Sequence, residues 1–127
     1  MISLSELTKT ATPDYEQLKN LKQLKKRLNV IRRKWGKPMI ITSGLRSREQ
    51  HEAIYRKLGK KAPGGSAHLA GLAADIYDRD GQLSLWLLDR LNLLEKLGLY
   101  MESPERTRGW VHLQFRSPLS GRRVFQP

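Results

Sequence analysis

His68 and Asp75 lie seven positions apart with a glycine between them, and few folds can bring their side chains together. Seven positions span roughly 10 Å along a helix and over ~20 Å along a strand, so the two side chains meet only if the chain doubles back. Gly71 suits that bend, because glycine adopts positive φ without a Cβ clash. We therefore predict a bend at Gly71 and, after it, a buried strand that turns Asp75 toward His68.

Such a pair is half of a metal site, and a further ligand is needed to complete it. The best candidate is His112, which lies in a run at residues 109–115 that is typical of a short strand. The alternative interpretation is a surface histidine in a Gly-Ala loop, with Asp75 capping a neighbouring element. The remaining histidine, His51, lies among charged residues of a predicted helix, where we expect a solvated side chain.

The donor types indicate which metal chemistry such a site would support. Two histidines and one carboxylate leave a fourth coordination position for water, which is the arrangement of a catalytic zinc site. The chain contains no cysteine, so a closed thiolate zinc site is excluded. The expected cofactor is therefore Zn²⁺.

Three motifs follow one another along the chain: Ser-Gly-Leu-Arg-Ser at residues 43–47, Ser-x-His-x-x-Gly-x-Ala-x-Asp at 66–75 and Trp-x-His at 110–112. In this order they resemble the zinc D-alanyl-D-alanine carboxypeptidase family, which includes phage L-alanyl-D-glutamate endopeptidases (endolysins). Leu-Ser-Glu-Leu at residues 4–7, before a predicted long helix, extends the resemblance over nearly the whole chain.

The resemblance implies a zinc ion held by His68, Asp75 and His112, with Arg46 reaching the substrate and Ser66 beside it. It also implies a Hedgehog/DD-peptidase-like fold and cleavage of peptidoglycan stem peptides, at either the D-Ala-D-Ala or the L-Ala-D-Glu bond. Arg46 would then orient the substrate or stabilise the oxyanion. The alternative for Arg46 is a surface arginine paired with a glutamate of the helix that follows.

Two positions depart from the pattern of that family. Many relatives carry a glutamate three residues before the last histidine as the general base, and Gly109 stands there in this chain. The family often reads His-x-Asp at the end of the motif, and here Gln114 takes the place of the aspartate. A carboxylate from elsewhere must therefore serve as the base.

Glu102 is the predicted base, because residues 99–102 and 109–115 plausibly form a hairpin. A turn centred on residues 105–107 places Glu102 opposite Trp110 or Val111. Opposite Trp110 it shares a face with His112, whereas a shift of one residue turns it away. Glu105 lies near the tip of the loop, where a side chain is poorly fixed. The alternative is that Glu102 is a plain exposed glutamate.

The whole chain predicts an α+β domain, in which a small, mostly antiparallel sheet carries the zinc ligands and about three helices cover it. A long helix is predicted to begin at Thr12 and Pro13 and to end at Gly36. Its apolar residues recur at three- and four-residue steps and predict the face that packs on the core: Leu18, Leu21, Leu24, Leu28, Ile31 and Trp35.

Shorter elements complete the prediction. A short helix or turn at 3–11 comes first, and a strand at 38–42 and a helix at 47–58 follow the long helix. A loop at 60–65 precedes the metal motif. One helix rich in leucine follows Gly81, and an exposed tail begins at Arg116.

Positive charge dominates the composition, with 24 Lys and Arg against 12 Asp and Glu and a formal net charge of +12. Such a balance predicts attraction to a polyanion, and the candidates are anionic cell-wall polymers, outer-membrane lipopolysaccharide and nucleic acid. No recognised basic-aromatic motif accompanies the lysines, which disfavours nucleic acid. The basic face of the long helix either docks onto an anionic surface or is simply solvated.

Length and hydropathy set expectations for organisation and location. At 127 residues we expect one domain, 1–127, and a monomer. No apolar run approaches the ~20 residues of a membrane span. The N-terminus lacks the basic and apolar regions of a signal peptide. We expect synthesis in the cytoplasm, followed by action at the cell wall after phage-mediated release or as part of a virion.

Most of these observations predict a zinc metallopeptidase that cleaves peptidoglycan stem peptides in phage-derived lysis of the cell wall. Gly109 and Gln114 motivate an alternative, a catalytically inactive zinc-binding module in phage assembly or wall attachment. Charge alone motivates a nucleic-acid-binding protein.

Overall fold

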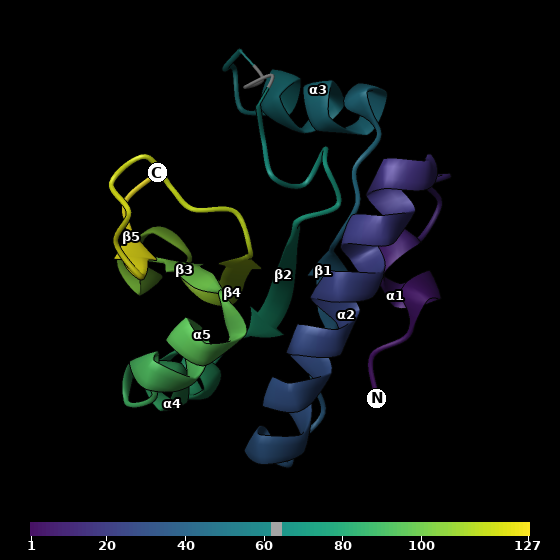
Figure 1. Cartoon of the computed structure of the whole chain (residues 1–127). Coiled ribbons are helices and arrows are strands. Elements are labelled where there is room, and N and C mark those ends of the chain that lie inside the picture. The colour runs from purple at the N-terminus through teal and green to yellow at the C-terminus, as the bar shows by residue number, and fades with distance from the viewer. Residues whose placement is uncertain (62–64) are drawn as a thin grey trace.

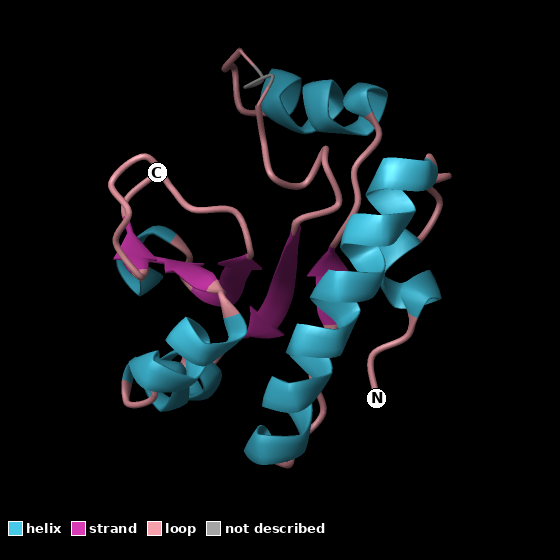
Figure 2. Cartoon of the chain, in the orientation of Figure 1, coloured by secondary structure: helices cyan, strands magenta, loops and turns pink. Residues whose placement is uncertain are grey.

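The computed structural model describes residues 1–61 and 65–127, which adopt the expected α+β fold (Figures 1 and 2). Part of the loop predicted at 60–65 lies outside the described residues. The helices are α1 (Leu4–Thr8), α2 (Tyr15–Trp35), α3 (Arg48–Lys57), α4 (Gln82–Leu88) and α5 (Leu91–Leu97). The strands are β1 (Ile41–Ser43), β2 (Ala73–Asp78), β3 (Tyr100–Glu102), β4 (Gly109–Gln114) and β5 (Val124–Phe125).

The strands form one sheet in the order β1-β2-β4-β3-β5, in which only the described pairing of β3 with β5 is parallel. The prediction of a small, mostly antiparallel sheet is therefore confirmed. Helix α2 crosses one face of the sheet, and α4 and α5 lie together below β3 and β4 (Figure 1). The described helices outnumber the three expected, since α1 is a true helix and the segment after Gly81 is split between α4 and α5.

Helix α2 begins with a capping box. The Asp14 side chain accepts a hydrogen bond from the Gln17 backbone N–H at 2.8 Å, and the Gln17 side chain accepts one from the Asp14 backbone N–H at 2.9 Å. The predicted start at Thr12 and Pro13 is thus too early, because this reciprocal pair satisfies the first free N–H groups two residues later. The helix ends at Gly36, as predicted.

The two faces of the central strands have different roles, because alternate residues point to opposite sides of a sheet. One face belongs to the hydrophobic core, where Ile41 and Val111 flank Ile76 on the neighbouring strands and Leu28 and Ile31 of α2 join the same cluster. The opposite face carries the Asp75 and His112 pair. The core therefore holds rigid the strands that present these two polar side chains.

The C-terminal segment was expected to be an exposed tail, and that prediction is wrong for Val124 and Phe125, although residues 119–122 are exposed. Strand β5 adds to the edge of β3, with the Ser103 N–H donating to the Phe125 carbonyl at 2.7 Å, and Phe125 is buried. The unpaired N–H and C=O groups of an edge strand favour such an addition. Only two residues pair, so no periodic pattern marks the strand in the sequence.

Candidate metal centre

The loop that carries His68 is folded tightly against helix α2. Gly71 adopts φ +75°, as predicted, and a Cβ there would lie 2.9 Å from the Gln17 carbonyl oxygen. The Gln17 side chain donates to the Leu69 carbonyl at 2.8 Å, and the Asn20 side chain donates to the Ala70 carbonyl at the same distance. Helix α2 therefore anchors the bend that returns the chain toward Asp75.

His68 is held by a backbone carbonyl. Its ring Nδ1 donates to the Gly44 carbonyl oxygen at 2.8 Å, which leaves Nε2 as the atom that faces Asp75 Oδ1 at 3.3 Å. A Cβ on Gly44 would collide with the Leu7 carbonyl, so the chain approaches α1 closely at this point. The loop after β1 thus supplies the acceptor that sets the orientation of the His68 ring.

His112 is oriented from the other side. It is the cross-strand partner of Asp75, and its Nδ1 lies 2.8 Å from Asp75 Oδ1. Its Nε2 lies 2.7 Å from Gln114 Oε1, while the Gln114 amide donates to the Arg116 carbonyl at 2.8 Å. Because the Gln114 oxygen must accept, His112 Nε2 carries the proton and Nδ1 is the atom available to a metal.

One ligand atom from each of His68, Asp75 and His112 lies within 4.8 Å of the others, and all three residues are buried. Each ring has its outer nitrogen occupied by a protein acceptor, so the inner nitrogens converge on the carboxylate. Two imidazole nitrogens and a carboxylate oxygen are a donor set that a catalytic metal ion accepts. The arrangement can hold a metal ion and leaves further coordination positions open.

The charges around Asp75 and the two histidines favour the ionised form of the Asp75 carboxylate, which is the form that binds a metal. Burial raises the pKa of Asp75, but the hydrogen bonds with His112 and His68 and their positive charge together outweigh it, and the pKa lies well below its ordinary value. Burial lowers the pKa of His112, yet the contact with Asp75 outweighs that effect and the pKa is raised. The attraction between Asp75 and the two rings thus favours the ionised carboxylate that a metal ligand requires.

A family model described as Peptidase M15 matches residues 2–114, which is most of the chain. The chain belongs to the peptidase M15 family. The match confirms the resemblance to the zinc D-alanyl-D-alanine carboxypeptidases and endolysins. No curated protein and no solved structure matched the chain.

Glu102 lies near His112, as predicted, although the predicted pairing register of β3 with β4 is wrong. Tyr100 pairs with Gln114 and Met101 with Leu113, so the next position, Glu102, lies level with His112 rather than with Trp110 or Val111. The turn of Pro104–Arg106 lengthens the connection, and the shift of two residues keeps Glu102 on the His112 face. Glu102 and His112 line a common cavity of about 480 Å³.

Burial raises the pKa of Glu102 and the nearby Asp75 raises it further, while the charges of His112 and Arg106 act in the opposite direction. The net result is a carboxyl group whose pKa is raised above its ordinary value of 4.5. A carboxylate with a raised pKa beside a metal site is suited to proton transfer near neutral pH.

Arg46 also reaches the metal centre. Its Nη2 lies 3.4 Å from Asp75 Oδ2, and its Nε donates to Ser43 Oγ at 3.0 Å. These contacts replace the alternative in which a glutamate of α3 would pair with it. Ser66 lines the cavity beside His112, and its Oγ accepts from the His68 backbone N–H at 3.3 Å. Both residues therefore lie beside the candidate ligands, and their contact with a substrate stays a prediction.

His51 was expected to be solvated, and the structure corrects this: the residue is only 1% exposed. Its Nδ1 lies 3.4 Å from Arg46 Nη1, and its ring meets that of Tyr55 at 4.9 Å between centroids. Sequence reasoning missed this position because the charged neighbours dominate the helix. The spacing of His51 and Tyr55 was the available signal, since residues four positions apart share one helix face.

Proposed function

We propose that this M15 peptidase binds one zinc ion through His68, Asp75 and His112 and hydrolyses a peptide bond in the stem peptides of peptidoglycan. The observation that carries the proposal is the convergence of three buried donor atoms within 4.8 Å, with both rings oriented by protein acceptors. Membership of the family supports a metallopeptidase that acts on peptidoglycan.

Zinc would supply Lewis-acid chemistry at this site, acidifying water and polarising the scissile carbonyl. Glu102 accepts the proton of the attacking water and returns it to the leaving amine, which requires the ionised carboxylate at the start of the cycle. The Arg46 guanidinium, 3.4 Å from Asp75 Oδ2, orients the substrate or stabilises the developing oxyanion.

Digestion of purified peptidoglycan followed by mass spectrometry of the fragments tests this proposal. Release of terminal D-alanine identifies a D-Ala-D-Ala carboxypeptidase, whereas stems that begin at D-glutamate identify an L-Ala-D-Glu endopeptidase. A His112→Ala protein is the matched control and should release neither product. Intact stems after digestion with the zinc-loaded protein would refute the proposal.

A second candidate, a zinc-binding module without catalysis in phage assembly or wall attachment, has one observation in its favour. Gly109, at the position of the base in many relatives, has no side chain and adopts φ +92° at the start of β4. Glu102 in the same cavity as His112 supports the peptidase instead. Retained zinc without turnover of peptidoglycan fragments would select the module.

We also propose that the protein acts at the cell wall in phage-mediated lysis or as part of a virion, as a monomer held by anionic wall or outer-membrane polymers. The basic side of α2 supports the polymer contact, since Lys22, Lys25, Lys26 and Arg33 line one shallow cavity with the N-terminal methionine. No helix among the described residues combines the length and apolar character of a membrane span. Cosedimentation with purified walls that does not weaken as salt rises would contradict electrostatic docking.

A further inference from the structure

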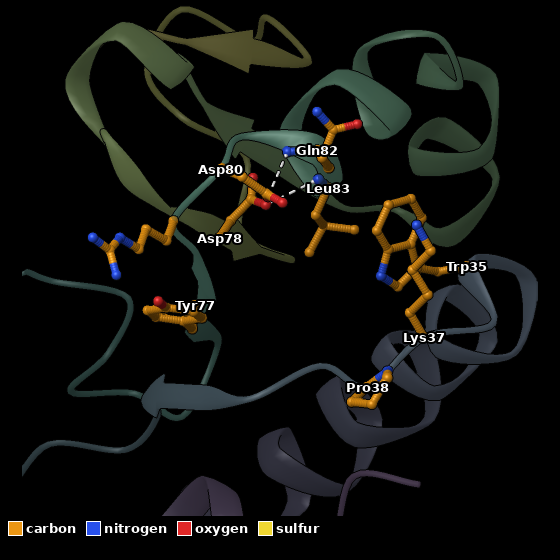
Figure 3. Close-up of a pocket in the computed structure, with 9 residues that line it drawn as sticks. Trp35, Lys37, Pro38, Tyr77, Asp78, Asp80, Gln82 and Leu83 are labelled. Carbon is orange, nitrogen blue, oxygen red and sulfur yellow. Dashed lines mark hydrogen bonds between the residues drawn. The ribbon is translucent and has the colours of Figure 1, made fainter.

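Two cavities of similar volume lie in different parts of the fold, and one of them adjoins the metal centre. The first, of about 530 Å³, lies between Trp35 at the end of α2 and Leu83 of α4 (Figure 3). The second, of about 480 Å³, is lined by Glu102 and His112 and shares no lining residue with the first. Pockets that hold small ligands measure roughly 300–1,000 Å³. A substrate that reaches His112 must therefore occupy the second cavity.

One wall of this second cavity comes from the C-terminal segment, at residues 116–120 and 125–127. The Peptidase M15 model matches residues 2–114, so the wall lies outside the matched part of the chain. Membership of the family therefore does not by itself assign what the wall contacts. Among the described residues that line the cavity, Arg116 is the one lysine or arginine, and Glu102 is the one acid.

Arg116 is held both at its backbone and at the tip of its side chain. Its carbonyl accepts a hydrogen bond at 2.8 Å from the amide of Gln114, the residue whose oxygen orients His112. Its Nη1 donates to the Gly65 carbonyl, in the loop that leads to His68. The side chain therefore joins the end of β4 to that loop, and little further ordering of Arg116 is needed when a ligand binds.

The Arg116 guanidinium keeps N–H groups and a positive charge available to a ligand. Within residues 1–61 and 65–127 it donates to Gly65 and forms no ion pair, since the ion pairs of that part of the chain all involve Asp75. Parallel N–H groups of a guanidinium match the oxygens of a carboxylate. Arg116 is also half-buried, which strengthens its attraction to an anion relative to bulk water. The single carboxylate of a small ligand fits this site better than a polyanion, because Glu102 lines the same cavity.

We propose that Arg116 recognises the free α-carboxylate of the stem residue that follows the cleaved bond, an inference that rests on the proposed function. Both candidate bonds are followed by such a group. After the D-Ala-D-Ala bond it is the terminal carboxylate. After the L-Ala-D-Glu bond it is the α-carboxylate of D-glutamate, which continues the stem through its side-chain carboxyl. The residue before either bond offers no free α-carboxylate, because that carboxyl forms the bond to be cleaved.

Recognition by Arg116 sets the direction in which the peptide lies across the metal centre. The leaving residue contacts the wall made by the C-terminal segment, and the scissile carbonyl lies at the metal ligands. Arg46 contacts Asp75 Oδ2 and lines a different cavity, together with Ser43. The two arginines therefore have separate tasks, in which Arg46 acts at the reacting carbonyl and Arg116 selects the residue that leaves.

Paired peptides that differ only in this carboxylate test the inference on the zinc-loaded protein. L-Alanyl-γ-D-glutamyl-L-lysine is compared with its D-isoglutamine form, and acetyl-L-lysyl-D-alanyl-D-alanine with its C-terminal amide. A peptide that is cleaved is compared by kcat/KM, and one that is not cleaved by calorimetric affinity. In the pair that the protein accepts, we expect the carboxylate form to be favoured by roughly 10- to 100-fold, the usual effect of a hydrogen bond to a charged group. Arg116→Gln should remove this preference by weakening the carboxylate form alone.

Arg122→Gln is the matched control, since it removes the same charge from an exposed residue of the same segment outside the cavity, and it should keep the preference. Arg116→Lys keeps the charge without the forked geometry, so it should reduce the preference and serves if Arg116→Gln does not fold. Equal treatment of both forms by the unaltered protein overturns the inference, and so does an equal loss for both forms in Arg116→Gln, the result of a purely structural tie to Gly65.

The proposed function is tested separately by the same peptides. Cleavage of the carboxylate and amide forms at equal rates removes the role of Arg116 and leaves the peptidase. A carboxylate preference in binding that Arg116→Gln abolishes, without cleavage of any peptide, removes the peptidase and leaves the recognition site.

Discussion

Two neighbouring steps of the β2 and β4 pair differ in their surroundings, although they share the same strands and the same face. At the first step, Asp75 and His112 are covered by the His68 loop, and Arg116 donates to the Gly65 carbonyl to tie the C-terminal segment to that loop. At the second, Tyr77 and Trp110 remain open. Covering removes water and makes charges interact strongly, whereas the open step keeps aromatic surface available for contact.

At the covered step, removal of one ligand should abolish both zinc binding and hydrolysis. His112→Ala leaves two of three protein ligands, and we expect loss of tight zinc binding and of all measurable hydrolysis. Elemental analysis of the purified protein should give one zinc per chain for the unaltered sequence and none for the variant. A variant that retained its zinc would show that the centre is assigned to the wrong residues.

A substitution of Glu102 tests whether this residue, which lies level with His112, transfers the proton. Glu102→Gln should keep zinc bound and lower hydrolysis by roughly 10²- to 10⁴-fold, the usual effect of losing a general base. Glu105→Gln, in the exposed turn between the same strands, is the matched control and should keep full turnover. Loss of zinc in Glu102→Gln would instead mean that the carboxylate supports the ligands.

The pH profile gives an independent measure of the same residue. The base must be ionised, and the pKa of Glu102 is raised by burial, so hydrolysis should fall as the pH is lowered while still above 4.5, the ordinary value of a glutamate. Rates at saturating zinc across the acid range would show this limb. A limb at or below 4.5 would separate Glu102 from the reaction.

Gln114 orients His112 without touching the metal, and its effect should be smaller. Gln114→Leu removes the acceptor at His112 Nε2, and we expect zinc affinity to fall by roughly 10- to 100-fold, as for other groups behind a ligating histidine. Competition with a chelator measures the affinity. Gln114→Glu, which keeps an acceptor oxygen, should restore most of it, and equal losses in both variants would contradict an orienting role.

The open step should contribute least to the folded state. Cross-strand pairs contribute about 0.2–1 kcal/mol each, so Trp110→Ala should lower the free energy of unfolding by about that amount while zinc remains bound. Urea denaturation measures the change. A much larger loss, or loss of zinc, would show that the aromatic pair supports the metal centre and that the two steps are not independent.

Local spacing was enough to predict several features of this protein. The separation of His68 and Asp75 required a bend, and Gly71 makes that bend with φ +75°. The apolar repeat of the long helix predicted its buried side, and Leu21, Leu24, Leu28 and Ile31 are all 0% exposed. Such patterns are readable because helical periodicity and the freedom of glycine depend on residues close together in the chain.

Other features depended on contacts between distant segments, and tertiary structure decided them. The turn of Pro104–Arg106 shifted the hairpin by two residues and set Glu102 level with His112. Strand β5 pairs with the edge of β3, and two residues are too few to show a periodic pattern in the sequence. His51 turned inward because Arg46 and Tyr55 lie beside it, not because of its charged neighbours. Register, edge pairing and inward orientation are set by loop geometry and long-range packing, and the spacing of residues along the chain does not encode them.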